Sequence, residues 1–350
     1  MYSSYTHFGK LKACVVGRSY SPNFYSWIKN PRLRNKFEQI AQETEEDYLS
    51  LCNLLTRFGV EVLRPSNPDY TVTGADRIPG PFSMTPRDSL CMIGEKLYRW
   101  DSQQHIAKSS SLRDWAGNTN VEKFNIKNDP YEVVEKHVAA QGNQVISNPV
   151  LQTVQPNGIY RLGDTLIIGT SADVDEQPII DCFPDYKIHT AESDGHIDGA
   201  MSIPCPGLIL SIKDFEVEYN KLYPDWEVCY LGNTSFAKVH DWRVLKMKNG
   251  GKWWLPDASE DDELVELVEH WLSDWVGYVE ETVFDVNILS VDEKNVIMSG
   301  YNETAFRTLL RYGITPHITP WRHRFFWDGG IHCITLDLDR QDSKKDYITL

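Results

Sequence analysis

Residues 54–65 have the sequence LLTRFGVEVLRP, in which the end of an amphipathic segment runs through Gly59 into a short apolar run closed by a proline. The same arrangement recurs at residues 139–149 and 309–320. A glycine at the end of a helix readily adopts the left-handed conformation that other residues avoid. Each stretch therefore predicts a helix, a glycine turn and a strand in succession.

Hairpin signals lie between these stretches. Short apolar runs turn back at Gly94-Glu95-Lys96, at Pro206-Gly207 and at Asp292-Glu293-Lys294. Hairpin, helix and strand repeated along the chain predict an α/β protein of pseudo-symmetric ββαβ units, although helix-glycine-strand joins also occur by chance in α/β proteins. Because such units bury their faces only by stacking, we expect one domain over residues 1–350.

Two long segments depart from this repeat. Residues 102–130 are polar and rich in serine and asparagine, which predicts a loop-rich excursion. Residues 257–279 show helical spacing of apolar side chains after a capping signal at Ser259 and Asp262, which predicts a helix.

Composition narrows the class of partner. The chain has 350 residues, of which 41% are hydrophobic, and this is enough for a large core. Its formal net charge of -15 argues against a nucleic acid or an anionic membrane as partner, since either would be repelled. A small cationic substrate is compatible with this charge.

Cysteine usage and the N-terminus indicate the compartment. The seven cysteines are an odd number without C-x-x-C spacing, so neither a disulfide framework nor a zinc knuckle is predicted. The first ten residues are polar and aromatic, and no stretch approaches the length of a membrane span. These features predict a soluble, cytoplasmic protein.

Cys333 is the first candidate for chemistry. It follows Gly329 and Gly330 and heads an alternating run over residues 334–339, which predicts a half-buried strand with the thiol at its mouth. A thiol held on a rigid element can act as a nucleophile. The alternative is that Cys333 is a small buried hydrophobe.

His196 and Asp198 are the second candidates. Two residues apart on an extended chain, they would point the same way and act on one small ligand, the imidazole moving a proton and the carboxylate binding positive charge. As a metal site the pair supplies only two ligands. A turn histidine without a role is the alternative.

Asp88 is the third candidate, because Pro86 fixes the entry into a strand that begins at this carboxylate. It could instead pair with Arg87 or cap a turn. Taken in order, Pro86-Arg87-Asp88, His196-Ile197-Asp198 and Gly329-Gly330-Ile331-His332-Cys333 resemble the glycine amidinotransferase branch of the guanidino-group modifying enzymes. Further matches over residues 11–18, 59–65, 139–142, 206–211 and 292–294 extend this resemblance along nearly the whole chain.

The resemblance implies a fold and a chemistry. The fold would be an α/β propeller of five ββαβ modules around a pseudo-fivefold axis, and the resemblance also implies a homodimer. Asp88 and Asp198 would align the guanidinium of L-arginine, Cys333 would attack it, and His196 would protonate the leaving amine. This reaction would give an S-amidino-cysteine and ornithine, and it would need no cofactor and no metal. The amidino group would then pass to a second amine, by default glycine, giving guanidinoacetate.

Three departures from the family pattern concern specificity and the histidine. Where an acid should orient His196, residues 154–157 are Val-Gln-Pro-Asn, so Asp164 is the nearest candidate acid. Phe215 falls where the family has an arginine for the substrate carboxylate, and residues 322–324 are candidate replacements for that cation. Glu280 and Glu281 align with a neutral serine pair of the substrate pocket, which predicts altered recognition of the acceptor.

Two alternatives to amidino transfer stay open on the sequence. Water in place of the second amine would make the chain an arginine deiminase or dihydrolase of the same superfamily. A catalytically silent propeller that serves as a binding module is the other, because the orienting acid is missing.

Overall fold

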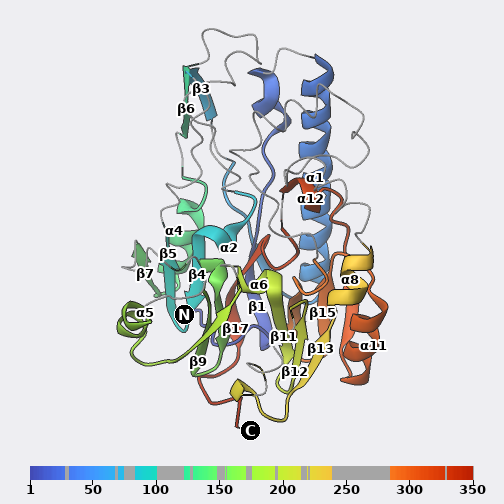
Figure 1. Cartoon of the computed structure of the whole chain (residues 1–350). Helices are drawn as coiled ribbons and strands as arrows, with labels where there is room; N and C mark the ends of the chain where they lie inside the picture. Colours follow the sequence, from blue (N-terminus) through green and yellow to red (C-terminus); the bar gives the residue numbers. More distant parts are fainter. Residues whose placement is uncertain are drawn as a thin grey trace.

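Hairpins extended by a third, parallel strand are the repeating unit of the computed structural model (Figure 1). The structure describes residues 1–27, 31–67, 70–74, 83–100, 122–126, 129–147, 154, 156–170, 176–193, 196–213, 219, 221–238, 284–327 and 329–349. Within these ranges there are five three-stranded sheets, each with one antiparallel and one parallel pairing. The expected propeller of five modules is thereby confirmed.

The five modules follow one another along the chain, except that the first module combines strands from the N-terminal and C-terminal parts of the chain. The first module contains β17 (Thr335–Gln341), β1 (Lys10–Val16), α1 (Pro31–Arg57) and β2 (Glu61–Leu63). The second contains β4 (Leu90–Ile93), β5 (Lys96–Arg99), α4 (Glu132–Ala140) and β7 (Gln144–Ser147). The third contains β8 (Ile159–Leu162), β9 (Thr165–Thr170), α5 (Gln177–Cys182) and β10 (Lys187–Glu192). The fourth contains β11 (Met201–Cys205), β12 (Leu208–Ser211) and β13 (Glu227–Tyr230). The fifth contains β14 (Leu289–Asp292), β15 (Asn295–Met298), α11 (Glu303–Arg311) and β16 (Thr315–Ile318).

Shorter elements connect the modules. Single turns of helix lie just before three of the hairpins: α2 (Pro86–Ser89), η3 (Pro156–Gly158) and α6 (Ile197–Ala200). The other connecting elements are η1 (Pro22–Trp27), β3 (Tyr70–Gly74), β6 (Glu122–Ile126), α8 (Gly232–Lys238) and α12 (Arg324–Trp327). None of the helices in the described part of the chain combines the length and apolar character needed to cross a membrane.

The two segments expected to depart from the repeat have different outcomes. The predicted loop over residues 102–130 was wrong in part, because β6 pairs there with β3 as an antiparallel ribbon. Residues 101–121 and the helix expected over residues 257–279 lie outside the described residues.

The three helix-ending glycines are confirmed. Gly59, Gly142 and Gly313 follow α1, α4 and α11 with φ of 76°, 91° and 75°. In this region a side chain would strain the backbone, so the local sequence alone fixes where each crossover helix ends. In each case the parallel third strand of the module begins two residues later.

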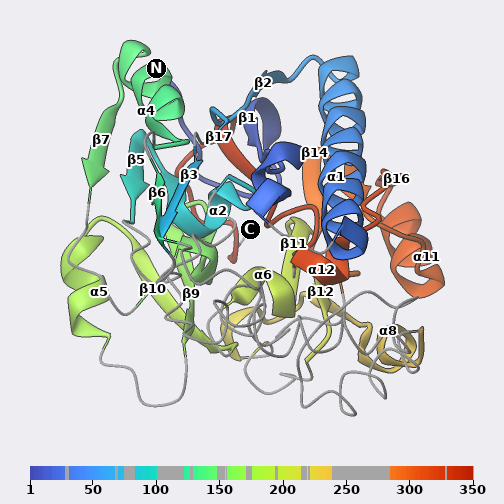
Figure 2. The same ribbon diagram turned by 90° about the horizontal axis from the view of Figure 1, so that it is seen from above.

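The core is divided among the joints between modules. Each cluster of buried apolar side chains combines strands of two neighbours: Leu336 with Leu97, for example, and Leu166 with Cys91. Similar clusters join the third module to the fourth and the fourth to the fifth. The view from above shows the modules arranged around a middle in which α2 and α6 lie (Figure 2). Stacking therefore buries the faces of the sheets, as the repeat requires.

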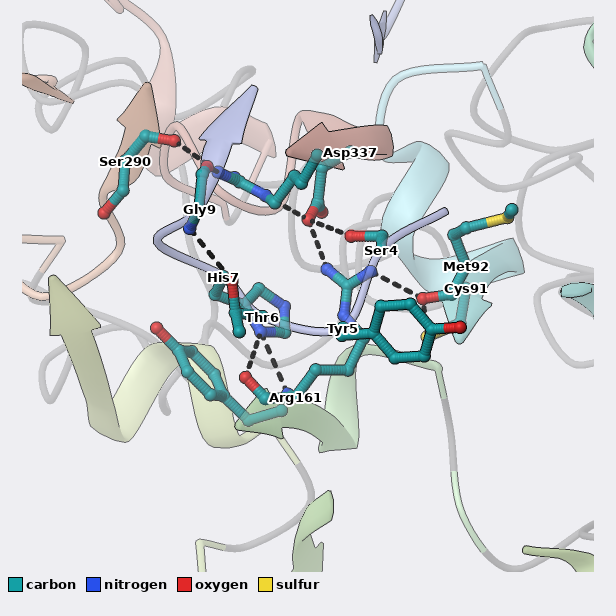
Figure 3. Close-up of polar contacts among 12 residues, drawn as sticks. Ser4, Tyr5, Thr6, His7, Gly9, Cys91, Met92, Arg161, Ser290 and Asp337 are labelled. Atoms are coloured by element: carbon teal, nitrogen blue, oxygen red, sulfur yellow. Dashed lines mark hydrogen bonds and ion pairs between the residues drawn. The ribbon is translucent and has the colours of Figure 1, made fainter. Parts of the chain in front are cut away.

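A buried ionic cluster occupies the centre, and it overturns one expectation. Residues 334–339 were predicted to alternate between buried and exposed, but Thr335 and Asp337 are both fully buried. Asp337 accepts from Arg87 Nη2 at 2.8 Å and from Arg340 Nε at 2.7 Å, and it also pairs with Arg161. Figure 3 shows Arg161 directed at this carboxylate, with Ser4 beside it. The strand crosses the centre of the molecule, so both of its faces are covered.

The charges in this cluster decide the state of Asp337. Burial alone would raise the pKa of the Asp337 carboxyl, but Arg161, Arg340 and Arg87 hold it well below its usual range. Arg161 and Arg340 also donate to the backbone oxygens of Met92, Gly9 and Ser290. One carboxylate thus ties together strands of four modules and the N-terminal segment.

Candidate active site

Each module contributes one polar side chain from the same place, the turn just before its first strand. Asp88 lies in α2, Asn157 in η3 and Asp198 in α6, whereas Asn287 precedes β14 and Cys333 precedes β17. Four of the five lie two residues before their strand and Asp198 lies three before. Since η3 packs against both α2 and α6, these turns meet at one end of the sheets (Figures 1 and 2).

The local structure at these turns differs from what the sequence predicted. Asp88 was placed at the start of a strand, but Pro86 begins the single helical turn α2 instead. His196 and Asp198 were placed on an extended chain, but His196 is the N-cap of α6 and Asp198 lies within it. Cys333, by contrast, lies in the turn just before β17, at the mouth of the strand as predicted.

Asn287 contacts the candidate nucleophile through both ends of its amide. Its Oδ1 accepts from the backbone N–H groups of His332 at 2.8 Å and Cys333 at 3.2 Å, and its Nδ2 donates to Cys333 Sγ at 2.9 Å. Gly330 makes room for this amide, because a Cβ there would lie 2.5 Å from Asn287 Oδ1. The thiol, only 3% exposed, is thus held beside a fixed N–H donor.

Asp198 binds the other side of the thiol. Its Oδ2 lies 3.4 Å from Cys333 Sγ and 2.7 Å from His332 Nδ1. Burial and the nearby Arg87 lower the pKa of His332 to about 4, so at pH 7 the neutral imidazole donates its Nδ1–H to the carboxylate. Burial would raise the pKa of Asp198, but this hydrogen bond and the Arg87 guanidinium hold it below its usual value. Asp198 is therefore ionised at neutral pH.

Arg87 supports this turn from the centre of the molecule. Its Nε donates to the backbone oxygens of His332 at 3.0 Å and Thr335 at 3.1 Å, while its Nη2 pairs with Asp337. The alternative pairing of Arg87 with Asp88 is therefore not adopted, and Asp88 turns toward Asn157.

Asn157 joins Asp88 to His196. Its Nδ2 lies 2.9 Å from Asp88 Oδ1 and 3.0 Å from His196 Nε2. The sequence had offered no role for Asn157, nor for Asn287 or His332. Asn157 and Asn287 each lie two residues before a strand, as Asp88 and Cys333 do. This shared position is the signal that would have indicated the two asparagines.

Two acceptor oxygens of this site lack a donor. Asp198 Oδ1 and Asn157 Oδ1 are buried and accept no hydrogen bond from any residue that the structure describes. A buried acceptor without a partner is costly, so such atoms in a native site are explained by a ligand or a water. The arrangement suits a planar, cationic group that carries several N–H donors.

Asp164 does not join this site. It lies in the turn between β8 and β9, at the opposite end of β8 from Asn157, where it pairs with Lys187 at 2.9 Å. The four residues of β8 separate the two ends by more than about 10 Å. Asn157, at the other end of this strand, contacts His196.

The remaining candidates lie elsewhere. Glu280, Glu281 and Phe215 are outside the described residues. Arg322 pairs with Asp47 at 2.9 Å and His323 with Glu43 at 2.6 Å, both on α1, so these side chains brace the long helix. All seven cysteines are free thiols, and no group of three His, Cys, Asp or Glu side chains suited to a metal occurs in the described ranges.

Comparisons with known proteins place this geometry in context. No protein-family model matches the chain. It is 24% identical over 333 residues to the mitochondrial glycine amidinotransferase of Gallus gallus, covering 85% of this chain and 69% of that protein. It is also 24% identical over 313 residues to the L-arginine:L-lysine amidinotransferase of Pseudomonas savastanoi pv. phaseolicola, covering 83% and 76%. The homologues of this chain are amidinotransferases.

Structure comparison agrees with these homologues. An amidinotransferase of the saxitoxin biosynthetic pathway from Microseira wollei matches with a TM-score of 0.62 at 18% identity, covering 99% of both chains. The resemblance inferred from the Asp88, His196 and Cys333 segments is thereby confirmed, and the amidinotransferase fold agrees with the five modules described above.

Proposed function

We propose that this chain transfers the amidino group of L-arginine to a second amine through a covalent intermediate on Cys333. The observation that carries the proposal is the buried thiol between the Asn287 amide and the Asp198 carboxylate, together with acceptor oxygens on Asp198 and Asn157 that receive no hydrogen bond from the described residues. A guanidinium supplies the N–H donors that these oxygens lack. The amidinotransferases among the homologues support the transfer chemistry.

The first half-reaction forms the intermediate. Asp88 and Asp198 bind N–H groups of the guanidinium, and His196 accepts the Cys333 proton. The thiolate attacks the guanidinium carbon and forms a C–S bond. The bond from that carbon to the side-chain nitrogen of arginine then breaks as His196 returns the proton to this nitrogen. Ornithine leaves, and an S-amidino group stays on Cys333.

The second half-reaction restores the enzyme. His196 takes a proton from the acceptor amine, whose nitrogen attacks the amidino carbon while the C–S bond breaks. His196 then returns this proton to the thiolate, so the Cys333 thiol is regenerated. No oxidant, metal or cofactor takes part in the balance. Glycine is the default acceptor, and the homologues named for glycine and for lysine mark the range of amines to be tested.

One incubation tests the proposal. The protein is mixed with L-arginine, with and without glycine or lysine, and ornithine, citrulline, ammonia and urea are measured. We expect ornithine in amounts that depend on the acceptor, and an amidino mass increment on the Cys333 peptide when the acceptor is absent. Acceptor-independent citrulline or ammonia would indicate a deiminase or dihydrolase instead.

Two variants complete the test. Cys333→Ala should lose turnover by orders of magnitude, because no covalent intermediate can form. Cys229→Ala is the matched control, since that cysteine is also buried but bonds Thr308 on the outer helix α11. Full turnover in Cys333→Ala would overturn the mechanism. No product and no adduct in the wild type would leave a binding module as the better account.

A further inference from the structure

We propose that Asn157 is a positioning residue that holds His196 in its neutral, proton-accepting form and ties it to Asp88. The inference rests on the proposed function, in which His196 must first accept the thiol proton. Asn157 stands where the sequence comparison expected an acid, and an amide and a carboxylate have opposite effects on a neighbouring imidazole.

The contacts fix the orientation of the amide. The Nδ2 group carries two hydrogens, and it lies 2.9 Å from Asp88 Oδ1, 3.0 Å from His196 Nε2 and 3.4 Å from His196 Nδ1. The reverse orientation would turn Oδ1 against the Asp88 carboxylate, acceptor against acceptor. Asn157 is itself 1% exposed, within a turn that packs against α2 and α6, so it cannot move aside easily.

This orientation selects one state of the histidine. An N–H of Asn157 can donate to either ring nitrogen only while that nitrogen has a free lone pair, which a neutral imidazole offers and an imidazolium does not. In the imidazolium both nitrogens carry hydrogens, so donor would face donor. Once His196 takes the thiol proton it loses the Asn157 hydrogen bond, which makes the imidazolium a better donor to the leaving amine.

Other charges around His196 act in the opposite direction. Asp88 is linked to His196 through the Asn157 amide. Asp198 lies two residues after His196 on α6, where it contacts His332 and interacts with the charge of Arg87. Both carboxylates favour the imidazolium, and the amide of Asn157 opposes them. A third carboxylate at this position would add to Asp88 and Asp198.

The test compares the wild type with Asn157→Asp, which keeps the size of the side chain. In protein labelled with ¹⁵N-histidine, the His196 ring signals are identified by their loss in His196→Gln and followed against pH. We expect a neutral imidazole at pH 7 in the wild type and an imidazolium in Asn157→Asp. The acidic limb of kcat/KM for arginine should move to higher pH by about one unit or more.

Two further variants separate positioning from stability. Asn157→Ala should lower kcat without moving the acidic limb upward, because it adds no charge. Asn143→Asp is the matched control, since Asn143 is a buried asparagine bonded to Tyr2 and Glu95 in another part of the fold. It should lower stability and leave the limb unchanged.

The outcomes are distinguishable from those of the proposed function. An imidazolium at His196 at pH 7 in the wild type, or identical titrations in the wild type and Asn157→Asp, would overturn the inference even if arginine is turned over. The spectra need no substrate, so the state of His196 is decided whether or not arginine reacts.

Discussion

At the scale of single residues, Asn287 has the most direct effect on the thiol. Replacing it by alanine removes the N–H donor of Cys333 Sγ and leaves two buried backbone N–H groups unpaired. We expect Asn287→Ala to lower kcat about a hundredfold, as the loss of a preorganised donor does, and to cost about 1–3 kcal/mol of stability. The rate of Cys333 alkylation by iodoacetamide should fall in parallel.

The control for Asn287 is a buried asparagine without a thiol. Asn143→Ala loses hydrogen bonds to the backbone of Tyr2 and Glu95, so its stability should fall while turnover and alkylation stay as in the wild type. Unchanged alkylation in Asn287→Ala would show that the amide has no influence on the nucleophile.

Residues with a reactive group could be predicted from the sequence, whereas the residues that hydrogen-bond to them could not. The thiol, the carboxylates and the imidazole stand out by chemistry, and the structure brings Cys333 and Asp198 into contact. Asn157 and Asn287 carry no such signal, because a neutral amide suits a turn equally well. Asp164 was chosen by distance along the chain, which a strand running away from the site makes misleading.

At the scale of elements, the turn over residues 329–334 depends on Gly330. Its added Cβ would lie 2.5–2.6 Å from three atoms of the Asn287 side chain, too close for any real contact. We expect Gly330→Ala to displace either the amide or the turn, and so to reduce kcat by at least about a hundredfold. Steady-state kinetics and a thermal melt measure the two effects.

Gly207→Ala supplies the comparison for that turn. Gly207 has a φ of 87° but no atom within 4 Å of an added Cβ, so the substitution costs about 1–2 kcal/mol of backbone strain without a clash. Its melting temperature should fall and its turnover should not. Equal turnover in Gly330→Ala and Gly207→Ala would contradict the packing argument.

Elements whose cause is local were predictable. Gly59, Gly142 and Gly313 end their helices because their backbone conformation demands glycine, and the hairpin turns at Gly94 and Gly207 follow the same rule. The one-turn helices α2 and α6 were mistaken for extended chain, because four residues are too few for a helical period to appear.

At the scale of the whole molecule, Asp337 holds the modules together by charge. Asp337→Asn would leave three buried guanidinium groups without their carboxylate, so we expect a loss of about 3–5 kcal/mol in urea unfolding. Asp339→Asn is the matched change on the same strand, and it affects one hydrogen bond to the Ser3 N–H. A similar small loss in both variants would show that the cluster contributes little.

Acid should destabilise the molecule through two buried imidazoles. Burial lowers the pKa of His7 well below 6.5 and that of His332 to about 4, so the unfolded chain binds protons that the folded chain refuses. The free energy of unfolding therefore keeps this contribution above pH 6.5 and decreases as the pH drops toward 4, by about 3 kcal/mol for His332 alone. Urea unfolding at several pH values checks this, and His332→Asn should make the fall shallower; an equal fall in both would contradict it.

The closure of the ring by two strands far apart in the sequence could not be predicted from local sequence patterns. The pairing of β1 with β17 sets Val15 opposite Leu336, and nothing in either segment identifies the other as its neighbour. For the same reason residues 334–339 were expected at a surface, where polar side chains alternate with apolar ones. Only the family resemblance carried information on the complete ring.

Because β1 pairs with β17, synthesis has an order with consequences. In a nascent chain β1 is translated long before β17, so one edge of the first sheet stays unpaired while the later modules emerge. Arg87 and Arg161 likewise lack the carboxylate of Asp337 until the last segment is translated, and Cys333 lies in that same segment. A ribosome that stalls before residue 333 therefore releases a chain that has neither its proposed nucleophile nor the strand that closes its ring.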